Sequence, residues 1–314
     1  MCKEHINAIK EVLKLSKKTL PILQCLCHTD DKLYATDLSV MVAIKTPTIA
    51  DGVWDATALD LGFREETKNK EFEPIDYPEL PELELETETE LTPEDMEKIL
   101  FTSKFVSKDQ TRPVLTGVAV KDGNVYASDG YFLHRDSLSV DKSISIIFPF
   151  EAIRVLKAVK ADKKNWTLSV YKNDQVALTS GNFTLYSKLI DGGTPNYDEL
   201  LRNSKTYDER FTLDLKTLAI PKGYYIRLDR QDRTLSLYDL DITKKMIPIQ
   251  TDLPVDNTTH ILNDWNKRTV IMAMRGTSER EIVFNPALLK PFGKAKVELS
   301  ANVKSLYIEV QEIK

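Results

Sequence analysis

The chain has 314 residues, of which 42% are hydrophobic and 29% are charged, and its formal net charge at pH 7 is −5. This composition is typical of a globular protein and argues against long disordered tracts, and no apolar run approaches the ~20 residues of a membrane helix. The acidic total also argues, at first, against nucleic-acid binding.

The first predicted element is an amphipathic helix over residues 3–18. Ile6, Ile9 and Leu13 recur at helical spacing and form its apolar side. A second stripe, well rotated from the first, consists of Lys3, Asn7, Lys10, Lys14 and Lys17. Two interpretations stay open for this stripe: it binds a polyanion, or it is a solvated helix face.

Two further helices that carry lysines are predicted over 93–108 and 149–164. The first begins after a helix-capping residue, Thr92, and the second buries an apolar side built on Val155 and Leu156. Basic residues lie to one side of the second helix, namely Arg154, Lys157, Lys160 and Lys164. The acidic residues concentrate elsewhere, above all in 65–97, so the chain is acidic in sum but has basic helices. This distribution can hold a polyanion on one surface.

The segments between the helices alternate with the period of β-strands. Residues 166–170 and 183–187 are predicted strands, and the order over 149–190 is helix, strand, turn, strand, turn, strand. The same order is predicted near the C-terminus, with a short helix over 286–293 and strands over 297–299 and 306–310. This repetition predicts duplicated α+β units built on antiparallel sheets.

Residue patterns of catalysis and metal binding are weak. Cys2, Cys25 and Cys27 are too few for a disulfide framework, which favours a reducing, cytoplasmic location, and the last two are expected to be buried on a strand. The carboxylates of 79–97 could suggest a catalytic pair, but their near-alternation with leucine favours an edge strand and a linker. We therefore expect no enzyme activity, no cofactor and no metal site.

Several longer motifs point to one family. They are TRPVLTGVAVKDGNVYASDGYFLH (111–134), FTLYSKLIDGGTPNYDELL (183–201), TLPIL (19–23), LYATDLSVMVAI (33–44) and IDYPELPEL (75–83). Together they resemble the bacterial sliding clamp, the β subunit of DNA polymerase III. The resemblance implies an α+β DNA clamp fold of repeated domains, with antiparallel sheets outside and helices lining a central hole. The implied domains are a shortened N-terminal domain over 1–85, a middle domain over 86–205 and a C-terminal domain over 206–314.

The resemblance also implies a function and a set of partners. A clamp of this family is a processivity factor that encircles duplex DNA without sequence specificity and tethers a DNA polymerase through a peptide-binding pocket. The implied partners are double-stranded DNA, a DNA polymerase, a clamp loader and a second copy in a head-to-tail homodimeric ring, with no membrane. The first domain is short between Leu61 and Tyr77, a trimming that would suit a phage or mobile-element clamp. An alternative therefore stays open, namely a monomeric adaptor or decoy that binds clamp-directed peptides without encircling DNA.

Candidate site residues follow from both lines of reasoning. The resemblance places Lys17, Lys18, Lys108, Gln110 and Arg112 near DNA, and the charge pattern adds Lys10, Lys14, Arg154 and Lys157. The resemblance further implies a partner-peptide pocket of Leu115, Ser128, Gly130, Tyr131, Phe132, Leu133, Pro195 and Leu200. The turn at Asp129-Gly130 predicts a positive φ at the glycine. Leu115 and Leu133 could instead be ordinary core residues.

Overall fold

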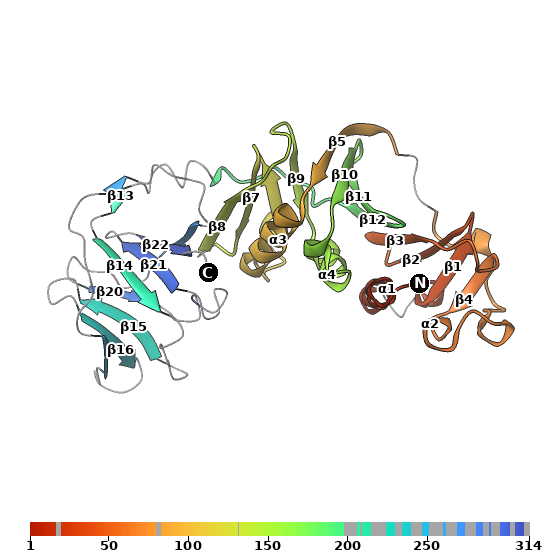
Figure 1. Cartoon of the computed structure of the whole chain (residues 1–314), viewed down its shortest axis with the longest axis horizontal. Coiled ribbons are helices and arrows are strands. Elements are labelled where there is room, and N and C mark those ends of the chain that lie inside the picture. Colours follow the sequence, from red (N-terminus) through yellow and green to blue (C-terminus); the bar gives the residue numbers. More distant parts are fainter. Residues whose placement is uncertain are drawn as a thin grey trace. The chain divides into compact units, whose positions relative to one another are not determined.

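The computed structural model describes residues 1–16, 20–79, 83–130 and 132–197, and beyond these mainly the backbone of strands. The chain divides into two compact units: unit 1 comprises 1–125 and 138–194, and unit 2 comprises 126–137 and 195–314. Figure 1 shows the helices and strands of each unit. The finer division into three domains stays a prediction.

Unit 1 is built on an eight-stranded antiparallel sheet with the order β4-β1-β2-β3-β12-β11-β10-β5. Its strands are β1 (Cys25–Thr29), β2 (Lys32–Thr36), β3 (Val40–Lys45), β4 (Gly52–Asp55), β5 (Leu85–Leu91), β10 (Trp166–Tyr171), β11 (Gln175–Ser180) and β12 (Phe183–Lys188). The helices are α1 (Lys3–Leu15), α2 (Ala58–Leu61), α3 (Pro93–Thr102) and α4 (Phe150–Ala158). Strand β6 (Val118–Lys121) pairs antiparallel with β9 (Ser145–Phe148), and β7 (Asn124–Ser128) begins in unit 1 and ends in unit 2.

The sheet of unit 1 consists of two similar halves. In one half α1 precedes the meander β1-β2-β3, and in the other α4 precedes the meander β10-β11-β12. The third strands of the two meanders pair antiparallel, with Val42 opposite Leu185, and so join the halves into one sheet. The predicted helix–strand order of 149–190 and its antiparallel strands are confirmed, but the segment that repeats this order here is α1 to β3, which the sequence analysis did not predict. The predicted edge strand is confirmed as well, because β5 is the last strand in the sheet order.

The helices are shorter than the sequence pattern predicted. We expected helices over 3–18, 93–108 and 149–164, but α1 ends at Leu15, α3 at Thr102 and α4 at Ala158. After α4 the chain adopts a left-handed conformation at Lys160, with φ of 54°, and continues as a 3-10 turn over Ala161–Lys163. The apolar periodicity continues beyond Ala158, the last residue of α4, because Val159 and Ala161 are buried although neither is α-helical. Lys160 and Lys164 therefore lie beyond the helix that they were expected to line.

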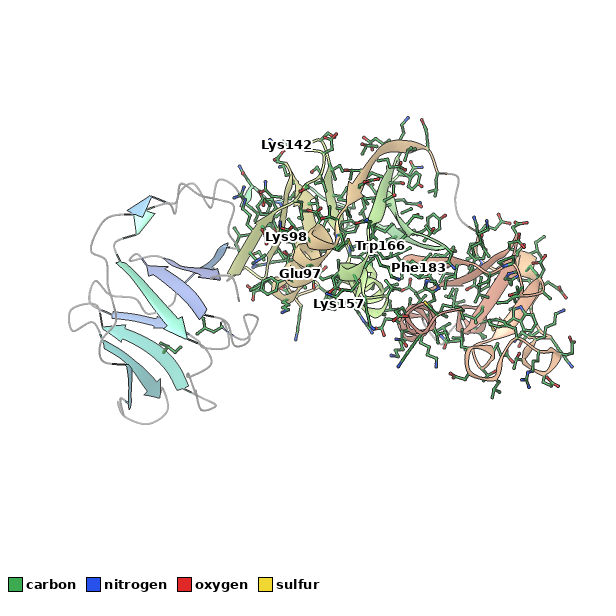
Figure 2. The ribbon with its side chains drawn as sticks, viewed as in Figure 1. Glu97, Lys98, Lys142, Lys157, Trp166 and Phe183 are labelled. Atoms are coloured by element: carbon green, nitrogen blue, oxygen red, sulfur yellow. The ribbon has the colours of Figure 1, made fainter. Side chains whose placement is uncertain are left out.

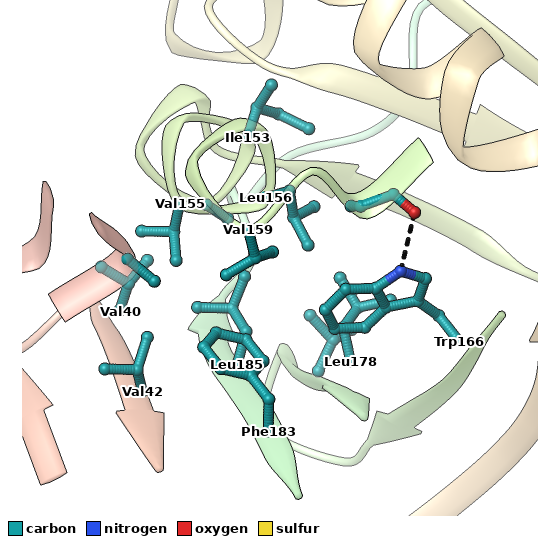
Figure 3. Close-up of a cluster of buried hydrophobic side chains, with 14 of the residues drawn as sticks. Val40, Val42, Ile153, Val155, Leu156, Val159, Trp166, Leu178, Phe183 and Leu185 are labelled. Atoms are coloured by element: carbon teal, nitrogen blue, oxygen red, sulfur yellow. Dashed lines mark hydrogen bonds between the residues drawn. The ribbon is translucent and has the colours of Figure 1, made fainter. Parts of the chain in front are cut away.

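The core of unit 1 lies between the sheet and the helices. Helix α1 packs on β2, β3 and α4, and α4 also packs on β12 (Figure 1). Figure 3 shows Val40 and Val42 from β3 and Leu185 from β12 facing Val155 and Val159 at α4. The Trp166 ring meets the Phe183 ring edge-on at 5.8 Å, and the indole nitrogen of Trp166 donates a hydrogen bond of 3.0 Å to the Ala161 carbonyl. This bond fixes the turn that ends α4.

On the opposite face of the sheet, strands β1 and β2 are covered by a chain segment over residues 69–79, called the covering segment, rather than by an α-helix. Alternation along β1 turns Cys25 and Cys27 away from the helices, and both thiols are buried, as predicted. Burial raises the pKa of each thiol to about 11, so both stay protonated at neutral pH. The covering residue is Tyr77, which is 4% exposed and whose hydroxyl lies 3.3 Å from the Cys25 carbonyl oxygen.

Unit 2 contains antiparallel strands from both ends of its sequence. Strand β8 (Phe132–Ser137) pairs with β19 (Thr269–Ala273), which pairs with β22 (Ser305–Val310). From there the order continues through β21 (Lys296–Ala301) to β14 (Glu209–Asp214). A four-stranded sheet has the order β17 (Ile247–Gln250), β16 (Thr234–Asp239), β15 (Tyr224–Asp229), β20 (Glu281–Phe284), and β13 (Thr206–Tyr207) pairs with β18 (His260–Ile261). The predicted strands near the C-terminus correspond to β21 and β22; of the predicted helix over 286–293, only Leu289 is described.

Candidate functional site

Helices α1 and α4 run antiparallel and are joined by ion pairs across their contact. Glu11 in α1 accepts a hydrogen bond of 2.8 Å from the Arg154 Nε of α4. Glu4 lies in the first turn of α1, and one of its carboxylate oxygens is 3.3 Å from the Nζ of Lys160, which follows α4. Hydrogen bonds from its own backbone amide and from Lys160 lower the pKa of the Glu4 carboxyl, so it is ionised at neutral pH. The helix pair is therefore held together by apolar packing on the side that faces the sheet and by these ion pairs nearer to solvent.

The predicted lysine stripe of α1 is turned away from the sheet. Ala8, Ile9 and Val12 are fully buried on the other side of the helix. The Lys14 side chain is 67% exposed, and its Nζ lies 3.3 Å from a Glu11 oxygen. The Lys10 side chain is 41% exposed, and its Nζ lies 2.6 Å from Asp60.

Lys157 lies on the side of α4 that faces away from the strands (Figure 2). Partial burial, and then the nearby charge of Lys104, lowers the pKa of Lys157. Its Nζ lies 5.6 Å from the centre of the Phe150 ring, and the Lys104 Nζ lies 4.5 Å from the centre of the Phe101 ring. Aromatic faces favour a cation at such distances. Because the positive charges of Lys104 and Lys157 lie near one another, an anion bound beside them would be stabilised.

The predicted DNA loop before β6 is exposed. Lys108, Gln110 and Arg112 are all exposed, and Asp109 organises the loop by accepting bonds from the Thr111 amide (3.0 Å) and hydroxyl (2.7 Å). Those hydrogen bonds lower the pKa of Asp109, so the loop contains a fixed negative charge among its basic residues. Lys17 and Lys18 lie outside the described residues.

Sequence reasoning missed the acidic partners of these cations. Glu11 stands three residues before Lys14 on one helix, a spacing that could have indicated a pair. No local signal could have paired Asp60 with Lys10 or Glu11 with Arg154, because the residues of each pair are far apart in the sequence. The structure thus brings Lys10, Lys14, Arg154 and Lys157 onto one helix pair, but three of these four are ion-paired.

Two of the predicted partner-peptide residues, Ser128 and Gly130, form the turn at the end of β7. Gly130 has φ of 89°, as predicted, and its amide donates a hydrogen bond of 3.1 Å to the Ser128 hydroxyl. The Tyr126 ring of β7 stacks on the Tyr197 ring at 5.2 Å. The Tyr197 amide donates a hydrogen bond of 2.8 Å to the Pro195 carbonyl. Neither tyrosine was among the predicted site residues, although each stands in one of the quoted motifs.

The remaining pocket residues are described only in part. Leu133 is 5% exposed on β8, and Leu115 belongs to unit 1, where it is half-buried in a 3-10 turn. Both interpretations of these leucines, pocket wall or core, stay predictions. Tyr131, Leu200 and the Phe132 side chain lie outside the described residues.

Two kinds of feature are absent from the described part of the chain. No group of three or more His, Cys, Asp or Glu residues is arranged there to hold a metal ion. Within the same ranges, no helix combines the length and the apolar character needed to cross a membrane.

Comparison with solved structures defines the fold class. A sliding clamp (DNA polymerase III subunit beta) from Pseudomonas aeruginosa superposes with a TM-score of 0.71, covering 98% of this chain and 97% of that one at 17% identity. The DNA polymerase beta subunit from Streptococcus pyogenes gives a TM-score of 0.70, covering 98% and 96% at 16% identity. The chain therefore has the α+β clamp fold of DNA polymerase III beta subunits, as predicted.

Sequence comparison gives a shorter match to the same proteins. The beta sliding clamp of Streptococcus pneumoniae is 27% identical over 134 residues, which are 40% of this chain and 35% of that one. The beta sliding clamp of Staphylococcus epidermidis is 28% identical over 167 residues, which are 50% of this chain and 42% of that one. These matches span less than half the length of the curated relatives, and no protein-family profile matches. The chain is a divergent relative of the bacterial beta sliding clamps.

Proposed function

We propose that this chain is a DNA sliding clamp, which encircles duplex DNA without sequence specificity and tethers a DNA polymerase. The observation that carries the proposal is the α1–α4 pair, which presents Lys10, Lys14, Arg154 and Lys157 away from the sheet in a fold shared with DNA polymerase III beta subunits. Lysines on helices meet phosphates through water and so attract any duplex without reading its bases. A clamp needs such contacts, because it must slide.

The distribution of acidic residues supports the same function. The three glutamates of β5, Glu86, Glu88 and Glu90, are exposed on the last strand of the sheet, not on the helix pair. A row of like charges on an edge strand discourages pairing with another strand. It also repels DNA from that edge, so attraction is restricted to the helices.

For polymerase tethering, the proposal rests on Ser128 and Gly130 at the end of β7 and on Leu133 of β8. The contact of the Tyr197 ring with the Tyr126 ring of β7, and the bond from the Tyr197 amide to the Pro195 carbonyl, support it. Aromatic and proline residues around a buried leucine are suited to anchor a short apolar peptide. A clamp loader and a second copy of the chain in a head-to-tail ring complete the proposed set of partners.

Retention on circular DNA tests encirclement directly. The chain, loaded onto nicked circular duplex with a clamp loader, should stay bound through gel filtration and be lost when the circle is cut. Its mass in solution should be that of two chains. A particle of one-chain mass that is lost equally from circular and linear DNA would overturn the ring and leave the monomeric adaptor as the function.

Charge reversal tests the helix pair as the DNA-binding surface. Lys10→Glu with Lys14→Glu should weaken duplex binding and flatten its salt dependence, by about 0.9 in slope per lost phosphate contact. Lys142→Glu is the control, compared per substituted lysine because the test variant has two substitutions; Lys142 is exposed and lies far from Lys157 in unit 1 (Figure 2). Equal effects of the double variant and the control would contradict the assignment of the surface.

A further inference from the structure

The face of the unit 1 sheet opposite α1 and α4 contains a hollow of about 420 Å³. Cys27, Tyr34 and Met41 contribute to it from strands β1, β2 and β3, on the side that alternation turns away from the helices. The covering segment that follows β4 contributes the other side, including Pro74, Ile75 and Tyr77. The volume lies within the ~300–1,000 Å³ range of ligand pockets in proteins.

The covering segment is fixed at both ends, so the hollow exists before any ligand arrives. At one end the Asn69 side-chain amide donates a hydrogen bond of 2.7 Å to Asp55 at the end of β4. At the other end Tyr77 is buried, and its hydroxyl reaches the carbonyl oxygen of Cys25. A preformed hollow avoids the ordering cost that a flexible segment would add to binding.

An apolar side chain is left in solvent at the rim of this hollow. Ile75 is 85% exposed, the highest exposure of the large hydrophobic residues in the described part of the chain. It follows Pro74 in a 3-10 turn over Pro74–Asp76, which holds it outward. A single exposed apolar residue needs no explanation by itself. Beside a hollow whose mixed lining includes Met41 and Pro74, it adds apolar area that a bound partner would cover.

The charges around the hollow have one sign. Among its lining residues only Asp30 and Glu79 are charged, and both are exposed carboxylates. A second hollow of about 400 Å³ shares Met41, Pro78 and Glu79 with the first and is also lined by Leu38, which is 47% exposed. The two hollows are therefore neighbours on one face, and the lining of the second also includes a cation, Lys188.

We propose that this face binds a short extended peptide of a partner protein, with a bulky apolar side chain in the first hollow and an adjacent arginine or lysine paired with Asp30 and Glu79. Ile75, Met41 and Pro74 contact the apolar residue, and the two carboxylates select the cation. The second hollow receives a further residue of the same peptide. The site lies within unit 1, is separate from the unit 2 turn proposed for polymerase tethering, and does not depend on that proposal.

Peptide selection on the full chain tests the site. A phage-displayed library of random short peptides, panned on the immobilised chain, should yield a consensus with arginine or lysine beside leucine, isoleucine or phenylalanine. A fluorescent synthetic peptide of that consensus should bind Ile75→Asp about tenfold more weakly than the unchanged chain. Leu61→Asp is the matched control, because Leu61 is 63% exposed on the same unit but does not line the hollow. Panning on Asp30→Lys with Glu79→Lys should change the selected charge from basic to acidic.

Each other outcome contradicts the proposal. No enriched consensus, a consensus without a basic residue, or equal loss of binding in Ile75→Asp and Leu61→Asp would overturn it. A fall in solution mass caused by Ile75→Asp would assign the face to a second copy of the chain instead. Because Ile75 is almost fully exposed, its replacement should leave thermal unfolding unchanged, and a melting curve checks that the variant is folded.

Discussion

Glu11 limits how many cations of the helix pair are available to DNA, and Glu11→Gln tests this. The Glu11 carboxylate binds Arg154 through one oxygen and Lys14 through the other. The amide of glutamine keeps the size of the side chain but removes its charge. Arg154 and Lys14 then lose their common counter-ion, and the surface gains one net positive charge.

The expected magnitude follows from the number of phosphates neutralised. If Arg154 gains one phosphate contact, the slope of log K against log salt steepens by about 0.9, which is about eightfold in affinity for a tenfold change in salt. If Lys14 gains one as well, the change in slope approaches about 1.8. The cost in stability is small, up to about 1 kcal/mol, because the bridge is partly exposed, with 37% of Arg154 and 17% of Glu11 in solvent.

The assay is duplex binding by fluorescence anisotropy over a series of salt concentrations. Glu86→Gln is the matched control, because it removes the same charge from the exposed edge strand β5. Tighter and steeper binding by Glu11→Gln alone supports the reasoning. An unchanged slope, or the same gain in the control, would refute it, because net charge and not the helix pair would then govern binding.

Three predictions concern stability. Burial lowers the pKa of His5 below its ordinary value of 6.5, so the folded state disfavours the charged ring. The free energy of unfolding is therefore full above pH 6.5 and decreases as the pH falls from 6.5 through the lowered pKa of the folded state. His5→Gln should remove this loss, as measured by denaturant titrations at several pH values. Thr92→Ala should cost about 1 kcal/mol, because the Thr92 hydroxyl accepts from the Asp95 amide at 3.1 Å, whereas Thr92→Ser should cost much less. Trp166→Phe should cost about 2 kcal/mol, because it removes one of the two hydrogen bonds that the Ala161 carbonyl accepts, the other coming from the Lys164 amide, and leaves a gap beside it; a cost under about 0.5 kcal/mol would contradict the role of that bond.

Much of the local structure could be predicted because its causes are local. Thr92, three residues before Asp95, gives a capping box, and Asn173-Asp174 gives a turn in which both residues have positive φ. Apolar periodicity located α1, α4 and the β10–β12 meander. It overestimated each helix at the C-terminal end, because buried residues such as Val159 continue the pattern after the hydrogen-bonded helix stops.

The candidate site was predictable in its residue types but not in its charge balance. The lysines of α1 are visible in the sequence as a stripe. Their effective charge depends on Asp60 and on the Glu11–Arg154 contact, which form only when α1 meets α2 and α4. The hollow at Ile75 had no sequence signal either, because its two sides come from strands and from a segment beyond β4.

The sequence by itself determined the elements, the repeated α+β order and the segregation of lysine onto helices, since each depends on neighbours a few residues apart. It also determined the likeness to the beta sliding clamps, through motifs that are long and irregular. Only the tertiary structure decided the pairing of β3 with β12, the antiparallel helix pair and the counter-ions that reduce its charge. Those features depend on residues distant in sequence, whose contacts arise when the apolar faces of the two halves are buried together.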